Sequence, residues 1–391
     1  MITWRSAVVV SHGRRWPGAA ELEASLDEGV GQIAAGASVR ALAYPGLVGL
    51  PAVGERVLLN VTALARGLGT GGYAMVVAPV DTLPDDPAPG PGHLVKARYT
   101  PLQEMVLGVD DQESAHHDVL RDADDLAGLP VVVADLHSAL PAIIAGARHA
   151  AAQAGRPAPR VAYVMTDGGA LPAWFSQAVA GLRSAGWIEA CLTTGQAFGG
   201  DLEAVTVHTG LLAARHVVGA DLVVVAQGPG NLGTGTRWGF SGVAAGEAVN
   251  AAATLHGAPV ASLRVSGADA RERHLGVSHH SLTAYGRVAL AAADIVLPVF
   301  DPALGPADDE AGTSFAELGQ RVRAQASGLV SPHGRHRLVG GAADAGLPAA
   351  LGASPGRLST MGRGLDADPA AFLAAAVAGV HAARLAADRV G

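Results

Sequence analysis

The sequence predicts an α/β protein with a Rossmann-like, doubly wound parallel sheet and a small N-terminal β-rich, barrel-like domain. Two observations lead to this prediction. Short apolar runs alternate with alanine-rich stretches that are long enough for helices, which is the pattern of a parallel sheet built from strand–helix units. Most of these runs are apolar throughout, as strands are when helices cover both faces of a sheet.

The small domain is predicted to occupy residues 1–80. Three short runs, 6–10, 56–60 and 73–78, are apolar or alternating and are divided by glycines. Short strands with glycine turns between them are typical of a small barrel or sandwich.

Residues 81–92 are rich in proline and offer almost nothing to bury, so they are predicted to be a linker. The remaining residues, 93–391, are predicted to form the α/β domain. Helices are expected over 139–154 and 241–255. The predicted strands are the six apolar runs 131–134, 161–165, 188–192, 222–226, 260–265 and 295–299.

The C-terminal extension of this domain is predicted to be irregular. A final helix is expected over 369–386, and Asp366 or Asp368 would cap its start. A loop-like region before it is framed by four arginines, Arg321, Arg323, Arg335 and Arg337.

Composition restricts the class of protein. The chain has 391 residues, of which 49% are hydrophobic, so it can bury a large core. No run reaches the roughly 18 uninterrupted apolar residues that a membrane helix needs, and the best candidate, 288–300, is short and broken by Asp294 and Pro298. The N-terminus lacks the pattern of a secretion signal, so we expect a cytoplasmic protein without membrane contact. Cys191 is the single cysteine, which excludes an intrachain disulfide.

The charge balance disfavours nucleic acid as a partner. The chain has 27 basic and 35 acidic residues, a net charge of −8, and only 4% aromatic residues for base stacking. Lys96 is the only lysine among these basic residues. Unlike arginine, lysine is a compact and deprotonatable cation, so Lys96 is a candidate for a charge or a nucleophilic amine in a site. The alternative, given equal weight, is that Lys96 was retained by chance.

Polar or glycine-rich loops follow five consecutive predicted strands. Asp135 and His137 follow the first strand, Asp167 follows the second, and Asp201 ends the loop after the third. Ligands of open parallel sheets bind beyond the carboxyl ends of the strands. These side chains are therefore expected to gather at one edge of the sheet.

The loop after the fourth strand, 228–239, is dominated by glycine and threonine. Glycines let backbone amides face an anion, especially where a helix begins close by. The loop is neither a Walker A motif nor GxGxxG, and a plain tight turn is the alternative interpretation. The candidate ligand-binding residues are Gly228, Gly230, Gly233, Thr234, Gly235 and Thr236.

The segment after the fifth strand, 264–280, holds eight ionisable side chains in seventeen residues. Its arginines, Arg264, Arg271 and Arg273, are predicted to clamp a phosphate or carboxylate. The alternative is an internal salt-bridge network with Asp269 and Glu272. Its histidines, His274, His279 and His280, are candidates for general acid–base catalysis.

A metal site is a further alternative for the histidines. With His137, Asp135, Asp167 and Asp269 they offer enough donor atoms, but no HExxH or similar spacing is present. Any metal ligands would have to come from separate loops. The sequence therefore identifies neither a metal nor another cofactor.

Seven motifs are specific when taken together: LNVTALARGLGTGGY, KARYTPLQ, YVMTDGGALP, TTGQAFGGD, GPGNLGTGT, RERHLGVSHH and LSTMGRGLD. Through them the chain resembles the DUF3866 proteins, a bacterial family of unknown function, over essentially its full length. The resemblance supplies no mechanism. It does place Lys96 in a shared motif, KARYTPLQ, which favours a functional role for this lysine.

The sequence therefore predicts an enzyme that acts on a small anionic, for example phosphorylated, metabolite. The glycine loop and the arginines would hold the anion, and a histidine paired with Asp135 or Asp167 would move protons. The alternative is a non-catalytic nucleotide or metabolite sensor or scaffold that uses the same pocket. Oligomeric state is left undefined.

Overall fold

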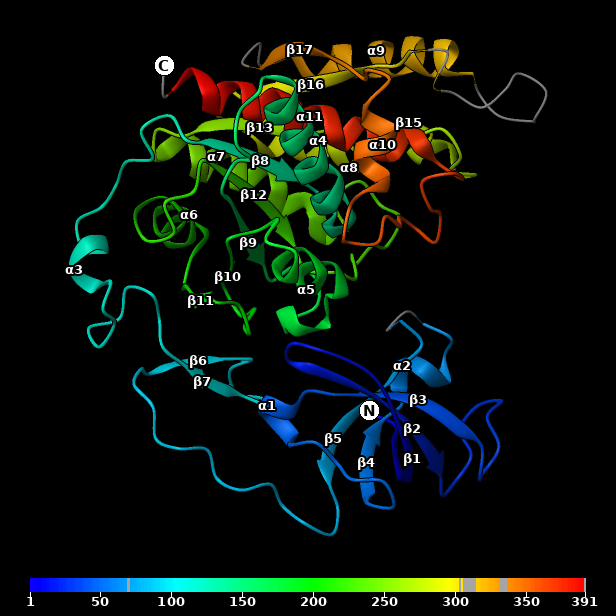
Figure 1. Ribbon diagram of the computed structural model, residues 1–391. Helices are drawn as coiled ribbons and strands as arrows, with labels where there is room; N and C mark the ends of the chain where they lie inside the picture. The colour runs from blue at the N-terminus through cyan, green and yellow to red at the C-terminus, as the bar shows by residue number, and fades with distance from the viewer. Residues whose placement is uncertain (69–70, 302–303, 305–313, 331–335, 390–391) are drawn as a thin grey trace. The chain divides into compact units, whose positions relative to one another are not determined.

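The computed structural model is shown in Figure 1. By their internal contacts the residues form two compact units, Met1–Val106 and Leu107–Gly391. The predicted limits 1–80, 81–92 and 93–391 stay a prediction. The structure describes residues 1–68, 71–301, 304, 314–330 and 336–389.

The first unit contains a closed five-stranded barrel, which confirms the predicted barrel-like domain. Its order is β1-β2-β3-β5-β4, and pairing of β1 with β4 closes it. Strands β1, β4 and β5 correspond to the three predicted runs, whereas β2 and β3 were not predicted. The strands are β1 (Trp4–Trp16), β2 (Ala19–Leu26), β3 (Ser38–Ala43), β4 (Arg56–Asn60) and β5 (Ala74–Pro79).

Shorter elements complete this unit. Two single-turn helices, α1 (Pro45–Val48) and α2 (Thr62–Ala65), lie between barrel strands in the chain. A two-stranded antiparallel sheet follows, made of β6 (Leu94–Lys96) and β7 (Glu104–Val106). Lys96 is the last residue of β6, and its side chain is buried.

The second unit is built on an eight-stranded sheet, and every pairing in it is parallel. The spatial order is β11-β10-β9-β12-β8-β13-β16-β17. All six predicted strands are present. The strands are β8 (Pro130–Ala134), β9 (Val161–Thr166), β10 (Ala190–Thr193), β11 (Leu202–Glu203), β12 (Leu222–Gln227), β13 (Ala258–Ser262), β16 (Asp294–Val299) and β17 (Arg337–Ala342).

Helices pack on both faces of this sheet, as in a Rossmann-like fold (Figure 1). One group consists of α4 (Leu140–Gln153), α10 (Leu347–Gly352) and α11 (Pro369–Asp388), which pack on one another. The other group is formed around α6 (Val207–His216) and α7 (Ala244–Thr254). The remaining helices are α3 (His117–Leu120), α5 (Gln177–Ser184), α8 (His279–Thr283) and α9 (Phe315–Val330).

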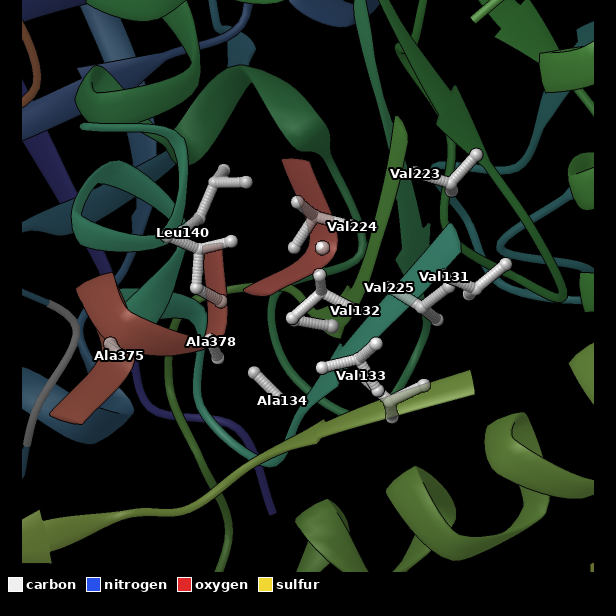
Figure 2. Close-up of a cluster of buried hydrophobic side chains, with 14 of the residues drawn as sticks. Val131, Val132, Val133, Ala134, Leu140, Val223, Val224, Val225, Ala375 and Ala378 are labelled. Atoms are coloured by element: carbon white, nitrogen blue, oxygen red, sulfur yellow. The ribbon is translucent and has the colours of Figure 1, made fainter. Parts of the chain in front are cut away.

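The core of this unit explains why its strands are apolar throughout. Val131, Val132 and Val133 of β8 are all fully buried. In Figure 2, Val132 points toward Ala375 and Ala378 of α11, whereas Val131 points to the opposite side. Successive side chains of a strand alternate between faces, so a strand covered by helices on both sides needs apolar residues at each position.

The helices α4 and α11 approach each other at two glycines. A Cβ atom added to Gly379 would lie 1.8 Å from the carbonyl oxygen of Ile143, and one added to Gly146 would lie 2.0 Å from that of Ala376. Neither position has room for a methyl group. These glycines therefore set the distance between the two helices.

The C-terminal extension is more regular than the sequence analysis predicted, so its loop-like assignment was wrong. Arg321 and Arg323 lie in α9, and Arg337 begins β17, which joins the edge of the sheet. Arg335 lies outside the described residues. The final helix, α11, was predicted correctly.

The start of α11 differs from the predicted cap. Asp368 is the N-cap residue, but its side chain makes no cap hydrogen bond. Instead, its carboxylate accepts hydrogen bonds from the Ser266 hydroxyl at 2.5 Å and from the Gly267 amide at 3.0 Å. Asp368 thus ties α11 to the segment that follows β13.

Among the described residues, α11 is the helix whose length and composition would allow it to cross a membrane. Its most apolar window is 67% buried within the fold. A core helix of an α/β protein has the same properties, so this is weak evidence for a membrane span.

Candidate functional site

A cavity of about 520 Å³ lies at the carboxyl ends of β8, β12 and β13. The chain leaves β8 toward α4 on one face of the sheet and leaves β12 toward α7 in the other helix group. Such a reversal creates the crevice in which open α/β sheets bind ligands. The predicted site residues that line the cavity are His137, Gly228, Gly230, Gly233, Gly235, Arg264, Arg271, Arg273, His274 and His280.

Arg264 lies two residues after the end of β13 and is largely buried. Burial lowers the pKa of its guanidinium. Its Nη1 donates a hydrogen bond to Nδ1 of His280 at 3.2 Å, and it forms no ion pair with a described residue. The carboxylates of Asp135 and Asp269 interact with this charge without forming an ion pair with it. A largely buried cation that no carboxylate contacts directly is energetically costly, so this group is suited to receive an anion.

The other two predicted clamp residues differ from each other. Arg271 donates to both carboxylate oxygens of Asp269, at 2.9 and 2.8 Å, and these hydrogen bonds hold the pKa of Asp269 well below its usual range. Arg273 forms no ion pair with any described residue. Glu272 pairs with Arg321. The internal salt-bridge network therefore exists for Arg271, while Arg264 and Arg273 keep unpaired charges.

The glycine loop 228–239 contributes backbone to the cavity. Gly228 is buried, and a Cβ atom there would lie 2.6 Å from the carbonyl oxygen of Ala170. The hydroxyls of Thr234 and Thr236 lie 3.1 Å apart and bond to Gly239, so both threonines stabilise the loop rather than line the cavity.

Three imidazole rings meet beside this loop. The ring centroids of His274, His279 and His280 lie between 4.4 and 5.0 Å from one another. His280 also stacks on Phe240, with ring centroids 3.8 Å apart. Burial, followed by the charge of Arg264, lowers the pKa of His274 and of His280 to about 3. Both rings are therefore neutral at pH 7.

The third ring, His279, has a different environment. Burial and then the charge of Arg273 lower the pKa of its imidazole. Its Nε2 is buried and has no hydrogen-bond partner among the described residues. His279 therefore has a buried ring nitrogen without a described partner.

The three histidines could hold a metal ion, since one donor atom from each lies within 4.8 Å of the others. Two observations oppose this use. Nδ1 of His280 already accepts from Arg264, and Arg264 and Arg271 lower the pKa of His274 through their charge. A site surrounded by guanidinium groups favours an anion over a cation.

Asp135 and His137 follow β8 but have different roles. Asp135 is buried, its Oδ2 has no partner among the described residues, and burial raises the pKa of its carboxyl to about 6. It lines a small cavity of about 30 Å³ together with Arg264, Ser138 and Thr360. Arg264, Ser138 and Thr360 also line the larger cavity.

His137 is held at both ring nitrogens. Nε2 lies 2.7 Å from the Ser176 hydroxyl and Nδ1 lies 3.0 Å from the Tyr163 hydroxyl. The Tyr163 hydroxyl donates to the carbonyl oxygens of Ala226 and Gln227, so it accepts from Nδ1–H of His137. Burial lowers the pKa of His137 to about 4. This chain of hydrogen bonds fixes the ends of β9 and β12 against the loop after β8.

Besides Thr234, Thr236, Asp135 and His279, three further predicted site residues do not line the cavity. Asp167 is exposed and accepts from the Gln196 amide at 2.9 Å. Asp201 accepts from the Cys191 amide and from Arg183, both at 2.7 Å. Lys96 belongs to β6 in the other unit, and its place in a site stays a prediction.

One wall of the cavity was not predicted from the sequence. It is formed by residues 357–361, which include Arg357, Ser359 and Thr360. Arg357 forms no ion pair with a described residue and adds a further positive charge. The shared motif LSTMGRGLD was the available signal, but nothing in it alone indicates which part of the sheet it contacts.

These features define an α/β protein with an arginine-rich candidate anion site at the carboxyl edge of a parallel sheet. The DUF3866 family, described as proteins of unknown function, matches residues 40–379. The chain therefore belongs to this family. No curated protein and no solved structure matches it.

Proposed function

We propose that the protein is an enzyme that binds a small anionic, for example phosphorylated, metabolite in the 520 Å³ cavity. The observation that carries this proposal is Arg264. Its guanidinium is largely buried and lacks an ion-pair partner among the described residues, and it faces the same cavity as Arg273 and Arg357. An anionic ligand would supply the missing negative charge.

Two groups next to the 520 Å³ cavity are candidates for proton transfer. The carboxyl of Asp135 has a pKa of about 6 and an oxygen without a described partner, and Nε2 of His279 is likewise unpartnered. A general acid or base works best with a pKa near the working pH. His274 and His280 remain neutral and would donate hydrogen bonds. Asp135 and His279 would then be the pair that moves protons.

The small cavity next to Asp135 bears on the type of reaction. A volume of about 30 Å³ is sufficient for one water molecule. A carboxylate beside a single water and an anion-binding arginine is an arrangement for adding water to an anionic substrate. We also propose that the protein acts in the cytoplasm and has no membrane partner.

Binding of inorganic phosphate and pyrophosphate, measured by isothermal titration calorimetry, tests the anion site. Arg264→Met should weaken binding by about tenfold or more, and the exposed Arg384→Met in α11 serves as the charge-matched control. Equal binding by the wild type and Arg264→Met would exclude the proposed site.

Turnover is tested with a panel of phosphorylated metabolites and mass-spectrometric detection of products. The double variant His279→Ala/His280→Ala should abolish turnover of any substrate that is found while its circular dichroism remains that of the wild type. Full activity in this variant would contradict catalysis by these histidines.

A second function, a non-catalytic metabolite sensor, is favoured by one observation. His274 and His280 titrate near pH 3, and both nitrogens of His137 are engaged by hydroxyl groups. Few groups therefore remain for proton transfer. A sensor would bind a metabolite tightly and return it unaltered in the same panel.

A further inference from the structure

A second cavity, of about 750 Å³, adjoins the first. Gly235 and Arg273 line both cavities. The second cavity is bordered by the end of the glycine loop, by α8 with the helical turn that follows it, and by α9. Because Gly235 and Arg273 line both cavities, the cavities are adjacent, and a ligand that occupied both would contact Arg273.

The second cavity is also cationic. Arg237 and Arg287 line it together with Arg273, and none of the three forms an ion pair with a described residue. No Asp or Glu is among the described residues that line either cavity. Positive charge therefore continues from Arg264 through Arg273 to Arg287, with no lining carboxylate to neutralise it. Such a row of arginines suits a ligand with several anionic groups.

An exposed aromatic ring stands next to these arginines. Trp238 lines the second cavity and is 55% exposed. It follows Arg237 in the glycine-rich loop. A large exposed aromatic side chain beside arginines is a platform on which a nucleobase can stack.

We propose that the two cavities form one site for a nucleoside polyphosphate. The phosphates would lie along Arg264, Arg273 and Arg287, and the base would stack on Trp238. This inference rests on the proposed anion site and names its ligand class. It does not depend on whether the ligand is turned over.

The test compares three probes by isothermal titration calorimetry: ATP, inorganic tripolyphosphate and orthophosphate. ATP is expected to bind at least tenfold more tightly than orthophosphate. Trp238→Ala should weaken ATP binding by about tenfold and leave tripolyphosphate unchanged, because only the nucleotide has a base to stack. Trp4→Ala, which removes an exposed tryptophan of the barrel, is the matched control.

The double variant Arg237→Gln/Arg287→Gln addresses the charges. It should weaken ATP and tripolyphosphate by about tenfold or more and leave orthophosphate, held at Arg264, unchanged. Arg384→Gln is the control for loss of a surface charge. Guanosine triphosphate in place of ATP then shows whether the stacked base is also selected.

The outcomes separate this inference from the proposed function. If ATP binds no more tightly than orthophosphate, or if Trp238→Ala and the double arginine variant leave ATP binding unchanged, the inference is wrong. Orthophosphate binding that still depends on Arg264 would then leave the anion site standing. If the wild type binds none of the three probes, both the proposed anion site and the nucleoside polyphosphate site are wrong.

Discussion

Nδ1 of His280 accepts a hydrogen bond from Nη1 of Arg264 at 3.2 Å. A guanidinium can only donate, so the proton of the neutral imidazole is on Nε2. Protonation of Nδ1 would break this hydrogen bond and place two cations side by side. This contact therefore fixes the tautomer of His280 and helps to keep it neutral.

Replacing Arg264 by methionine should raise the pKa of His280 by about one unit or more, because a nearby positive charge and a hydrogen bond to the neutral form are both removed. The Cε1–H resonances of the histidines, followed by NMR through a pH titration, measure this shift. Arg357→Met is the control, since Arg357 lines the same cavity and is not among the causes that lower the pKa of His280. Equal titration of His280 in all three proteins would contradict the assigned tautomer.

Replacing Asp135 by asparagine should stabilise the protein above pH 6 while removing activity. Burial raises the pKa of this carboxyl from 3.8 to about 6. The folded state thus binds a proton more tightly than the unfolded state, and the ionised carboxylate reduces the free energy of unfolding at pH 8. That cost disappears as the pH falls below 4.

Urea denaturation at pH 8 and pH 4.5 measures the effect. Asp135→Asn should raise the free energy of unfolding by about 1–3 kcal/mol at pH 8 and by much less at pH 4.5. Asp366→Asn, at an exposed position, should change neither value. An equal gain at both pH values would show that the carboxylate charge is not the cause.

Replacing Tyr163 by phenylalanine should lower the free energy of unfolding by about 1–3 kcal/mol, because it leaves Nδ1–H of His137 and two carbonyl oxygens without their partner in a buried site. Chemical denaturation gives the value. Tyr99→Phe removes a hydroxyl from a side chain that is 85% exposed and should have little effect. If Tyr163→Phe leaves the free energy of unfolding unchanged, a water molecule replaces the lost hydroxyl group.

Replacing Gly379 by alanine should destabilise the fold by about 1–3 kcal/mol or more, because the new methyl group would overlap the backbone of α4. Gly319→Ala in α9 is a matched control within a helix. A Cβ atom there meets no other heavy atom within 4 Å, so this variant should gain about 0.5–1 kcal/mol from helix propensity. Thermal unfolding compares the two, and similar melting temperatures would argue against close contact of α4 and α11.

Much of the sheet could be predicted from local sequence, because a strand covered on both faces needs apolar residues at successive positions. Val131–Val133 in β8 is such a case. The barrel strands β2 and β3 were missed because polar residues such as Glu21, Glu23 and Arg40 interrupt them. Which face of a barrel strand is buried depends on its neighbours, which no local pattern reveals.

The candidate site was predicted in part. The glycine loop and the segment after β13 line one cavity because β12 and β13 both lie next to β8 in the sheet. Asp167 and Asp201 also follow strands, but those strands, β9 and β10, lie farther from β13 in the sheet. Arg357 comes from a segment remote in sequence. Strand order and long-range packing decided these outcomes, and neither is encoded in spacing along the chain.

The place of α11 in the chain has a consequence for synthesis. This helix follows all the strands of the sheet in sequence, yet it packs against β8, β13, β16 and β17. While a ribosome is still translating residues before 369, the apolar sheet face that α11 covers stays open to solvent. The nascent α/β unit thus completes its core only once α11 has been synthesised, and until then it presents a surface suited to chaperone binding or aggregation.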